Sequence, residues 1–152
     1  AQIKEHSFTR VYNTVVVGSV EDDFGTIDAP IGRHPKDRKK QAVTDKNSRN
    51  AVTHFEVLER FKGFTFLKVR LETGRTHQIR AHLAFLEMPI LGDSRYGINN
   101  LNRQLKMKYQ ALCSKKIKFG QISDKRYSYL SDKEFICPDP WFVESFYKRE
   151  FK

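Results

Sequence analysis

The stretch Leu71-Glu-Thr-Gly-Arg-Thr-His-Gln-Ile-Arg-Ala-His82 marks the clearest change of pattern in the chain. Residues 64–71 alternate between apolar and polar side chains, as a half-buried strand does. From residue 76 to residue 87 the apolar side chains recur at helical spacing. We therefore expect a strand, a glycine turn and a helix that is capped by Thr76 and stopped by Pro89. The expected apolar stripe of this helix comprises Ile79, Leu83 and Leu86.

The segments before this stretch are typical of strands. Residues 11–17 form a β-branched run that ends at Gly18, and residues 51–59 turn from alternating to apolar. The turn at Gly63 joins residues 51–59 to residues 64–71 as an antiparallel hairpin. Pro30 reduces residues 26–31 to a short or edge strand. The other expected elements are a long basic loop at 32–50 with a short strand at 41–44, strands at 113–119 and 133–136, a short helix within 101–112 and a terminal helix at 141–151.

The size and composition indicate one globular domain, or a piece of a larger one. The chain has 152 residues, of which 39% are hydrophobic and 30% charged. No segment approaches the roughly 20 apolar residues of a membrane helix, and the first residues lack the apolar region of a signal peptide. Cys113 and Cys137 form no CxxC motif, so we expect two reduced thiols rather than a disulfide framework or a zinc site.

Positive charge is concentrated in the middle of the sequence. The net charge is +10, and residues 61–120 alone account for +9, with 12 Lys and Arg against 3 Asp and Glu. Clustered Lys and Arg displace counterions from phosphates, so this block favours a polyanionic partner. The alternative is a generally basic surface without a specific ligand.

Arg75 stands at the expected start of the helix. The unpaired N–H groups of a helix N-terminus attract anions, and Arg75 adds a full charge, so a carboxylate or phosphate would be favoured there. The alternative for Arg75 is a structural ion pair with a core carboxylate. His77 and His82 do not share one helical face, which argues against a metal pair and favours hydrogen bonds within the fold.

At these residues the sequence resembles a known family. LETGRTHQIRAHL followed by PILGDSRYG is similar to the third motif of the RluA/RluD-type RNA pseudouridine synthases. The order of the other motifs agrees, because residues 12–18 resemble the YxAxVxG strand and residues 25–33 the GxIxxPIGR turn. Residues 51–55 resemble the AxTxY/F strand, and residues 110–119 the strand that closes the family's sheet. The resemblance implies an α+β fold with a mixed, largely antiparallel sheet and flanking helices.

One departure from the family pattern concerns the catalytic aspartate. The family carries it in an HRLDxxTSG motif before the YxAxVxG strand, and the 152 residues contain no such string. Residues 48–50, Ser-Arg-Asn, also differ from the Gly-Lys that family members often have. We therefore expect residues 1–152 to be the C-terminal portion of a pseudouridine synthase catalytic domain, inactive by itself. The aspartates that occur in other contexts and do not replace the catalytic one are Asp22, Asp23, Asp28, Asp37 and Asp93.

The resemblance also implies site residues. Arg75 corresponds to the arginine that partners the catalytic aspartate, and an arginine beside a carboxyl favours its ionised form. Tyr12 corresponds to the tyrosine that stacks on the flipped-out base, although it could be a core tyrosine. Ile79 corresponds to an apolar residue that lines the uracil pocket, although a plain core role is the alternative. The candidates for phosphate contacts, any of which could instead be a solvated charge, are Arg33, Lys36, Arg38, Lys39, Lys40 and Arg95.

The implied function is isomerisation of uridine to pseudouridine in structured RNA, with 23S ribosomal RNA favoured and transfer RNA as a second RNA class. The family reaction uses no metal or organic cofactor, and we expect a cytoplasmic enzyme without a membrane partner. The alternative from another functional class is a non-catalytic RNA-binding module.

Overall fold

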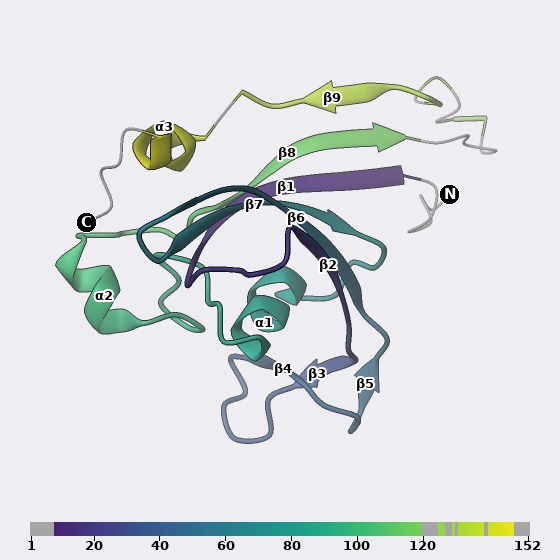
Figure 1. Ribbon diagram of the computed structural model, residues 1–152. Helices are drawn as coiled ribbons and strands as arrows, with labels where there is room; N and C mark the ends of the chain where they lie inside the picture. The colour runs from purple at the N-terminus through teal and green to yellow at the C-terminus, as the bar shows by residue number, and fades with distance from the viewer. Residues whose placement is uncertain (1–7, 120–124, 127–128, 130, 139, 148–152) are drawn as a thin grey trace.

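A computed structural model of the chain describes residues 8–119, 125–126, 129, 131–138 and 140–147. Two antiparallel sheets and three helices form this part of the chain (Figure 1). Among these helices, none combines the length and the apolar character that a membrane crossing requires.

The larger sheet has six strands in the order β2-β6-β7-β1-β8-β9. Every pairing in it is antiparallel, so the predicted α+β fold with a largely antiparallel sheet is confirmed. β2 is a short edge strand, as predicted, and it ends before Pro30, which cannot donate a ladder hydrogen bond. The bounds of the strands are β1 Phe8–Val17, β2 Phe24–Asp28, β6 Val52–Phe61, β7 Phe64–Leu71, β8 Leu112–Phe119 and β9 Glu134–Ile136.

The β6–β7 hairpin is the predicted one and closes through a two-residue loop. Phe61 pairs with Phe64, which leaves Lys62 and Gly63 as the loop. Both have positive φ values, 46° and 83°. Turns with two positive φ values match the right-handed twist of the flanking strands, and glycine adopts that conformation without strain.

A second sheet was only partly predicted. It contains three short strands in the order β4-β3-β5 and lies below the larger sheet in Figure 1. The expected strand at 41–44 is β4 (Gln41–Val43). β3 (Ile31–Arg33) begins at the last residue of the strand expected at 26–31 and continues into the expected loop, and β5 (Ser48–Arg49) lies within that loop. Strands of two or three residues are too short to show a period, so sequence patterning could not reveal them.

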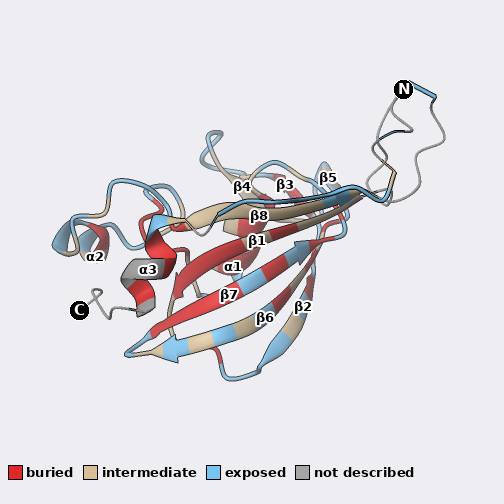
Figure 2. Ribbon diagram, turned by 90° about the horizontal axis from the view of Figure 1, so that it is seen from above, coloured by how far each residue is buried: buried red, intermediate tan, exposed pale blue. Residues whose placement is uncertain are grey.

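The two faces of the larger sheet carry different elements. The Thr53 hydroxyl lies 2.7 Å from a ring nitrogen of His82, so the Thr53 face is covered by α1. Because Thr53 is registered with Leu71, and Leu71 with Arg10, alternate residues Arg10 and Tyr12 share that face. Phe66 faces the other way and contacts Phe146 of α3, with ring centroids 5.7 Å apart. Figure 2 shows the buried centre of β1 and β7 between these layers.

The helix predicted at 76–87 is shorter than expected. α1 spans Gln78–Phe85, and its N-cap is His77, with φ 53°, so the prediction of a Thr76 cap is wrong. Because the backbone of His77 is left-handed, the helix begins at Gln78, two positions after the expected start at residue 76. At the other end Glu87, with φ 61°, ends the helix before Pro89 can. Leu86 is 38% exposed and lies beyond the helix, so only Ile79 and Leu83 of the expected stripe are buried.

The other two predicted helices are present, but their bounds differ from the predicted ones. α2 is Asn99–Gln104, earlier than the predicted region 101–112, and α3 is Trp141–Tyr147. The last part of the terminal helix predicted to residue 151 lies outside the described residues. Phe142 of α3 is 1% exposed and belongs to the main core, which explains how this helix is held.

Candidate active site

Arg75 lies in the turn between β7 and α1. Its Nε donates a hydrogen bond to the Asn50 carbonyl oxygen at 2.8 Å, and its Nη2 donates to Asn50 Oδ1 at 3.1 Å. The Arg75 N–H also donates to Gln78 Oε1 at 3.0 Å. The turn that precedes β6 therefore fixes the direction of the guanidinium group. These contacts go to neutral oxygens and leave the predicted role toward a carboxylate untested.

Tyr12 lies on β1 at a bulge. It is registered with Val69 on one side and with Ser114 on the other, and the β1–β8 register shifts between Val11 and Tyr12. Its side chain is on the α1 face, is half-buried and packs against the main core. Ile79 in the first turn of α1 is 5% exposed and belongs to the same core. This packing fits the core alternatives, and the base-stacking and pocket-lining roles stay predictions.

Arg10 is a residue of this region that the sequence analysis missed. A Cβ atom on Gly74 would lie 2.5 Å from Arg10 Nη1, so the Arg10 guanidinium rests against the residue that precedes Arg75. The signal was available, because Arg10 is two residues before Tyr12 and must share its face of the strand. A second cationic group therefore flanks the Arg75 turn.

A buried chain of hydrogen bonds fixes the start of α1. Gln78 Oε1 accepts from the Thr73 hydroxyl at 2.7 Å, and Gln78 Nε2 donates to Thr53 Oγ1 at 2.9 Å. The nitrogens of His82 lie 2.7 Å from Thr53 Oγ1 and 2.9 Å from the Ala29 carbonyl oxygen. Because a carbonyl can only accept, His82 Nε2 carries a proton, and in the neutral ring Nδ1 accepts from the Thr53 hydroxyl.

Burial favours the neutral form of His82. It lowers the pKa of His82 from its ordinary value, against the opposing hydrogen bond to Ala29 and the charge of Asp28. The structure supports the expected role of His82, which is to form hydrogen bonds within the fold. Among the described residues no group of three or more His, Cys, Asp or Glu side chains could hold a metal ion.

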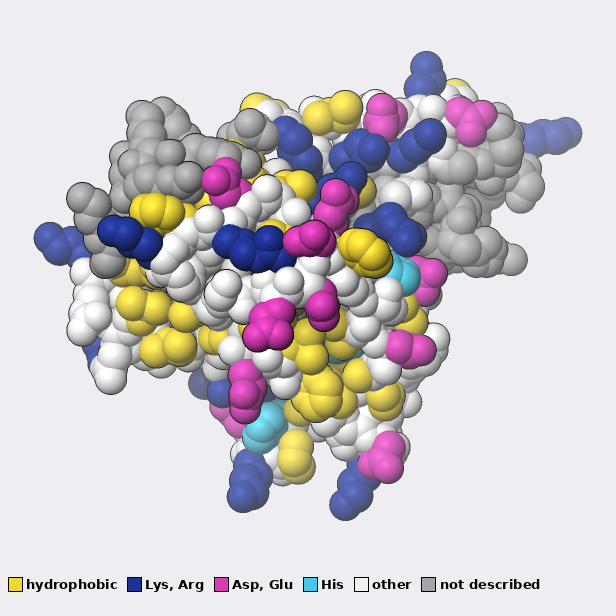
Figure 3. Space-filling view, in the orientation of Figure 1, with side chains coloured by type: hydrophobic (Ala, Val, Ile, Leu, Met, Phe, Trp, Pro, Cys, Tyr) yellow, Lys and Arg dark blue, Asp and Glu magenta, His cyan; other side chains and the backbone are white. Residues whose placement is uncertain are grey.

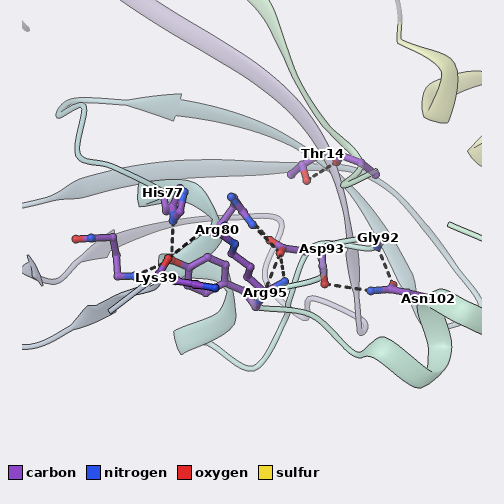
Figure 4. A network of polar contacts seen from close by, with 11 residues as sticks. Thr14, Lys39, His77, Arg80, Gly92, Asp93, Arg95 and Asn102 are labelled. Atoms are coloured by element: carbon purple, nitrogen blue, oxygen red, sulfur yellow. Dashed lines mark hydrogen bonds and ion pairs between the residues drawn. The ribbon is translucent and has the colours of Figure 1, made fainter. Parts of the chain in front are cut away.

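A second network joins α1 to the loop after it (Figure 4). Arg80 donates two hydrogen bonds to Asp93, at 2.8 and 2.9 Å, and the Asp93 side chain is 0% exposed. Asp93 Oδ1 also accepts from the backbone N–H groups of Arg95 and Tyr96. Burial acts to raise the pKa of Asp93, but the Arg80 and backbone hydrogen bonds outweigh it and hold the pKa below its usual range. Asp93 is therefore a structural carboxylate.

Tyr96 connects this network to the basic loop between β3 and β4. Its hydroxyl accepts from the Gln41 N–H at 2.7 Å and lies 2.8 Å from His77 Nδ1. The Arg80 guanidinium carbon lies 5.0 Å from the centre of the Tyr96 ring. Burial, then the charges of Arg80 and Arg95, lower the pKa of His77. The α1 start, the Asp93 loop and the basic loop thus form one connected unit.

The predicted phosphate contacts mostly lie on this unit. Five of the six come from the segment 33–40, and Arg95 Nη1 donates to the Lys39 carbonyl oxygen at 3.0 Å. All except Lys40 are exposed, and Lys40 Nζ lies 5.8 Å from the centre of the Tyr96 ring. The structure therefore brings the candidates near one another and near α1, while their contact with RNA stays a prediction.

The positive block at 61–120 does not form one surface. Lys68 and Arg70 lie on the sheet face opposite α1, whereas Arg80 is paired with Asp93. Lys115, Lys116 and Lys118 are on β8. On the face in Figure 3, Lys and Arg side chains along the sheet are interspersed with Asp and Glu side chains. Folding therefore distributes a charge that the sequence concentrates.

A pocket of about 340 Å³ lies beside Arg75. It opens between the small sheet and the β7–α1 turn. Among the described residues, no Asp or Glu lines it. Asp23 is elsewhere, paired with Arg60 at 2.9 Å, and Asp37 accepts a hydrogen bond within its own loop. The lining residues are Ile31, Gly32, Arg33, Gln41, Asn47, Arg49, Gly74, Arg75 and Thr76.

Comparisons with known proteins identify the family of this α+β domain. Residues 1–85 match the family model described as RNA pseudouridylate synthase. An uncharacterized RNA pseudouridine synthase YlyB of Bacillus subtilis is 53% identical over 96 residues, 63% of this chain and 31% of that protein. The ribosomal large subunit pseudouridine synthase D of Xanthomonas campestris is 54% identical over 96 residues, 63% of this chain and 28% of that protein.

The fold itself has a solved counterpart. The human RNA pseudouridylate synthase domain containing 1 superposes with a TM-score of 0.77 at 23% identity, over 91% of this chain and 58% of that one. The chain belongs to the RNA pseudouridylate synthase family. It spans about three tenths of the length of the two bacterial relatives.

Proposed function

We propose that the chain is part of an enzyme that isomerises uridine to pseudouridine in RNA. The family membership and the position of Arg75 support this proposal. One relative is named for the large ribosomal subunit, and we therefore favour 23S ribosomal RNA over transfer RNA as the substrate. A cytoplasmic location follows from such a substrate and is part of the same proposal.

The proposed reaction exchanges one bond of the base for another. The C1′–N1 glycosidic bond breaks, the uracil turns, and C1′ joins C5, while C5 loses a proton and N1 gains one. An ionised aspartate carries the covalent or proton chemistry, and Arg75 holds it charged and oriented. Tyr12 stacks on the base, which has left the stack of the RNA. No metal or organic cofactor is part of this proposal.

The observation that carries the proposal is the Arg75 turn. Its guanidinium is oriented by Asn50 and borders a pocket in which the described residues supply no carboxylate. We propose that residues 1–152 are the C-terminal portion of a catalytic domain. The HRLD segment of the longer polypeptide then supplies the aspartate.

The test compares two proteins on the same RNA. The longer polypeptide with an HRLD segment, and the 152-residue chain, are incubated with unmodified ribosomal and transfer RNA, and pseudouridine is mapped chemically. We expect conversion by the former only. Conversion by the 152-residue chain alone would contradict the placement of the catalytic aspartate. RNA binding without conversion by either protein would favour a non-catalytic binding module.

A further inference from the structure

The pocket beside Arg75 is also lined by two arginines of the small sheet. Arg33 and Arg49 come from β3 and β5 of the small sheet, and both line the pocket. The sequence analysis named Arg33 as a candidate phosphate contact and gave Arg49 no role. Their neighbouring positions appear only when β3 and β5 pair.

The register places these two side chains on the same face of the small sheet. Ile31 is directly opposite Arg49, and Arg33 is two residues beyond Ile31. Arg33 and Arg49 are therefore diagonal neighbours, whose Cβ atoms lie about 7–8 Å apart in an antiparallel pair. Gln41 is directly opposite Arg33 and also lines the pocket. Arg33, Arg49 and Gln41 thus line the pocket from the same face of the small sheet.

Arg33 and Arg49 have no counterion among the residues that the structure describes. Within the described part of the chain, Arg33 and Arg49 take part in no ion pair and no side-chain hydrogen bond. Arg75, which also lines the pocket, adds a third positive charge. Close cations without an anion repel one another, and a bound anion removes that repulsion. A planar guanidinium fork is suited to phosphate oxygens.

We propose that this pocket binds a phosphodiester group of the RNA strand next to the target uridine, held by Arg33 and Arg49. The assignment rests on the proposed function, which supplies the RNA. The volume of the pocket, about 340 Å³, is at the lower end of the range for small-ligand sites. The position beside Arg75 makes the pocket a determinant of where the strand lies relative to the reacting base.

A larger depression has a different character. It lies on the sheet face opposite α1, measures about 840 Å³ and is lined by acidic as well as basic side chains. Among the latter, Arg70 is exposed. An Arg70→Gln variant removes the same charge as Arg49→Gln from a different face, which makes it the matched control.

The test measures binding of a labelled RNA hairpin with a uridine-rich loop to the 152-residue chain, at several KCl concentrations. Each phosphate contact contributes about 0.7–0.9 to the slope of log affinity against log salt. We expect Arg33→Gln and Arg49→Gln each to lower the slope by about that amount, and Arg70→Gln to leave it unchanged. Thermal unfolding of each variant controls for folding. An unchanged slope in both pocket variants, or an equal fall in Arg70→Gln, overturns the proposal.

A competition arm separates an RNA phosphodiester from free phosphate. Inorganic phosphate should displace the RNA no better than chloride does at equal ionic strength. Much stronger displacement would identify a site for free phosphate and overturn the assignment to RNA. These slopes need no turnover, so pseudouridine mapping with the longer polypeptide carrying Arg49→Gln tests the proposed function separately. If the longer polypeptide converts uridine while the pocket variants keep the salt slope of the parent chain, the proposed function stands and the assignment of the pocket is wrong.

Discussion

Two arginines of one motif have different surroundings and hence different expected roles. The Arg80 side chain is 14% exposed and held by two hydrogen bonds to Asp93, which raise its pKa. Arg75, five residues earlier, faces a pocket and is oriented by Asn50. The residue type is the same, but only Arg75 borders a space that a substrate could enter.

Arg75 can be tested by two substitutions in the longer polypeptide. Arg75→Met removes the charge at similar length, and Arg75→Lys keeps the charge but loses the planar fork. If Arg75 holds the aspartate ionised, the Met variant should lose on the order of a hundredfold or more in single-turnover rate, as losses of a positioned donor do. The Lys variant should lose less.

RNA affinity is the control for this prediction. It should fall little in the Arg75→Met variant, since the pocket phosphate is assigned to Arg33 and Arg49. A preserved rate at saturating RNA, accompanied by a smaller salt slope, would make Arg75 a phosphate contact instead.

At the scale of elements, α1 is positioned by polar contacts as much as by its short apolar stripe. Gln78 and His82 fix it to β6 and to Ala29 after β2, and Arg80 fixes it to the loop that contains Asp93. Gly92 permits this loop, because it has φ 83° and a Cβ there would lie 2.2 Å from the Tyr109 carbonyl oxygen. The GRTHQIR and GDxxYG motifs are thus complementary halves of one packing unit.

The Arg80–Asp93 pair gives a stability prediction. Asp93→Asn leaves a partly buried guanidinium without its counterion, and breaking such a pair costs about 3–5 kcal/mol. The free energy of unfolding in urea should fall by that amount. Asp23→Asn is the control, because the Asp23 side chain is 80% exposed beside Arg60 and such a pair contributes less than about 1 kcal/mol. Equal losses in the two variants would show that Asp93 is not a structural anchor.

At the scale of the whole molecule, the free energy of unfolding should depend on pH through His77 and His82. Burial lowers the pKa of His82 and of His77 in the folded chain, while the unfolded value is about 6.5. The unfolded state therefore binds more protons below about pH 6.5, and unfolding becomes easier. The free energy of unfolding should be constant above about pH 7 and fall as the pH drops toward the lowered folded pKa values.

A variant isolates the contribution of His82. His82→Gln removes one of the two titrating groups, so the unfolding free energy should depend less steeply on pH between about 6.5 and 5. Urea titrations at several pH values measure both curves. An identical slope in the variant and the parent chain would mean that His82 does not titrate on unfolding.

The sequence by itself determined the central strands, the β6–β7 hairpin and the existence of α1. These features depend on local periodicity and on turn residues such as Gly63, which act over a few neighbouring positions. The family resemblance likewise rested on contiguous strings such as GRTHQIR. Arg75 and Tyr12 could be named for that reason, although their catalytic roles stay predictions.

Only the tertiary structure decided which distant groups meet. It paired Arg80 with Asp93 and placed the charges of the +9 block on several surfaces. It also created the small sheet, and with it the pocket of Arg33 and Arg49. The physical reason is that these contacts join residues far apart in the chain, and no periodic pattern within one segment encodes them.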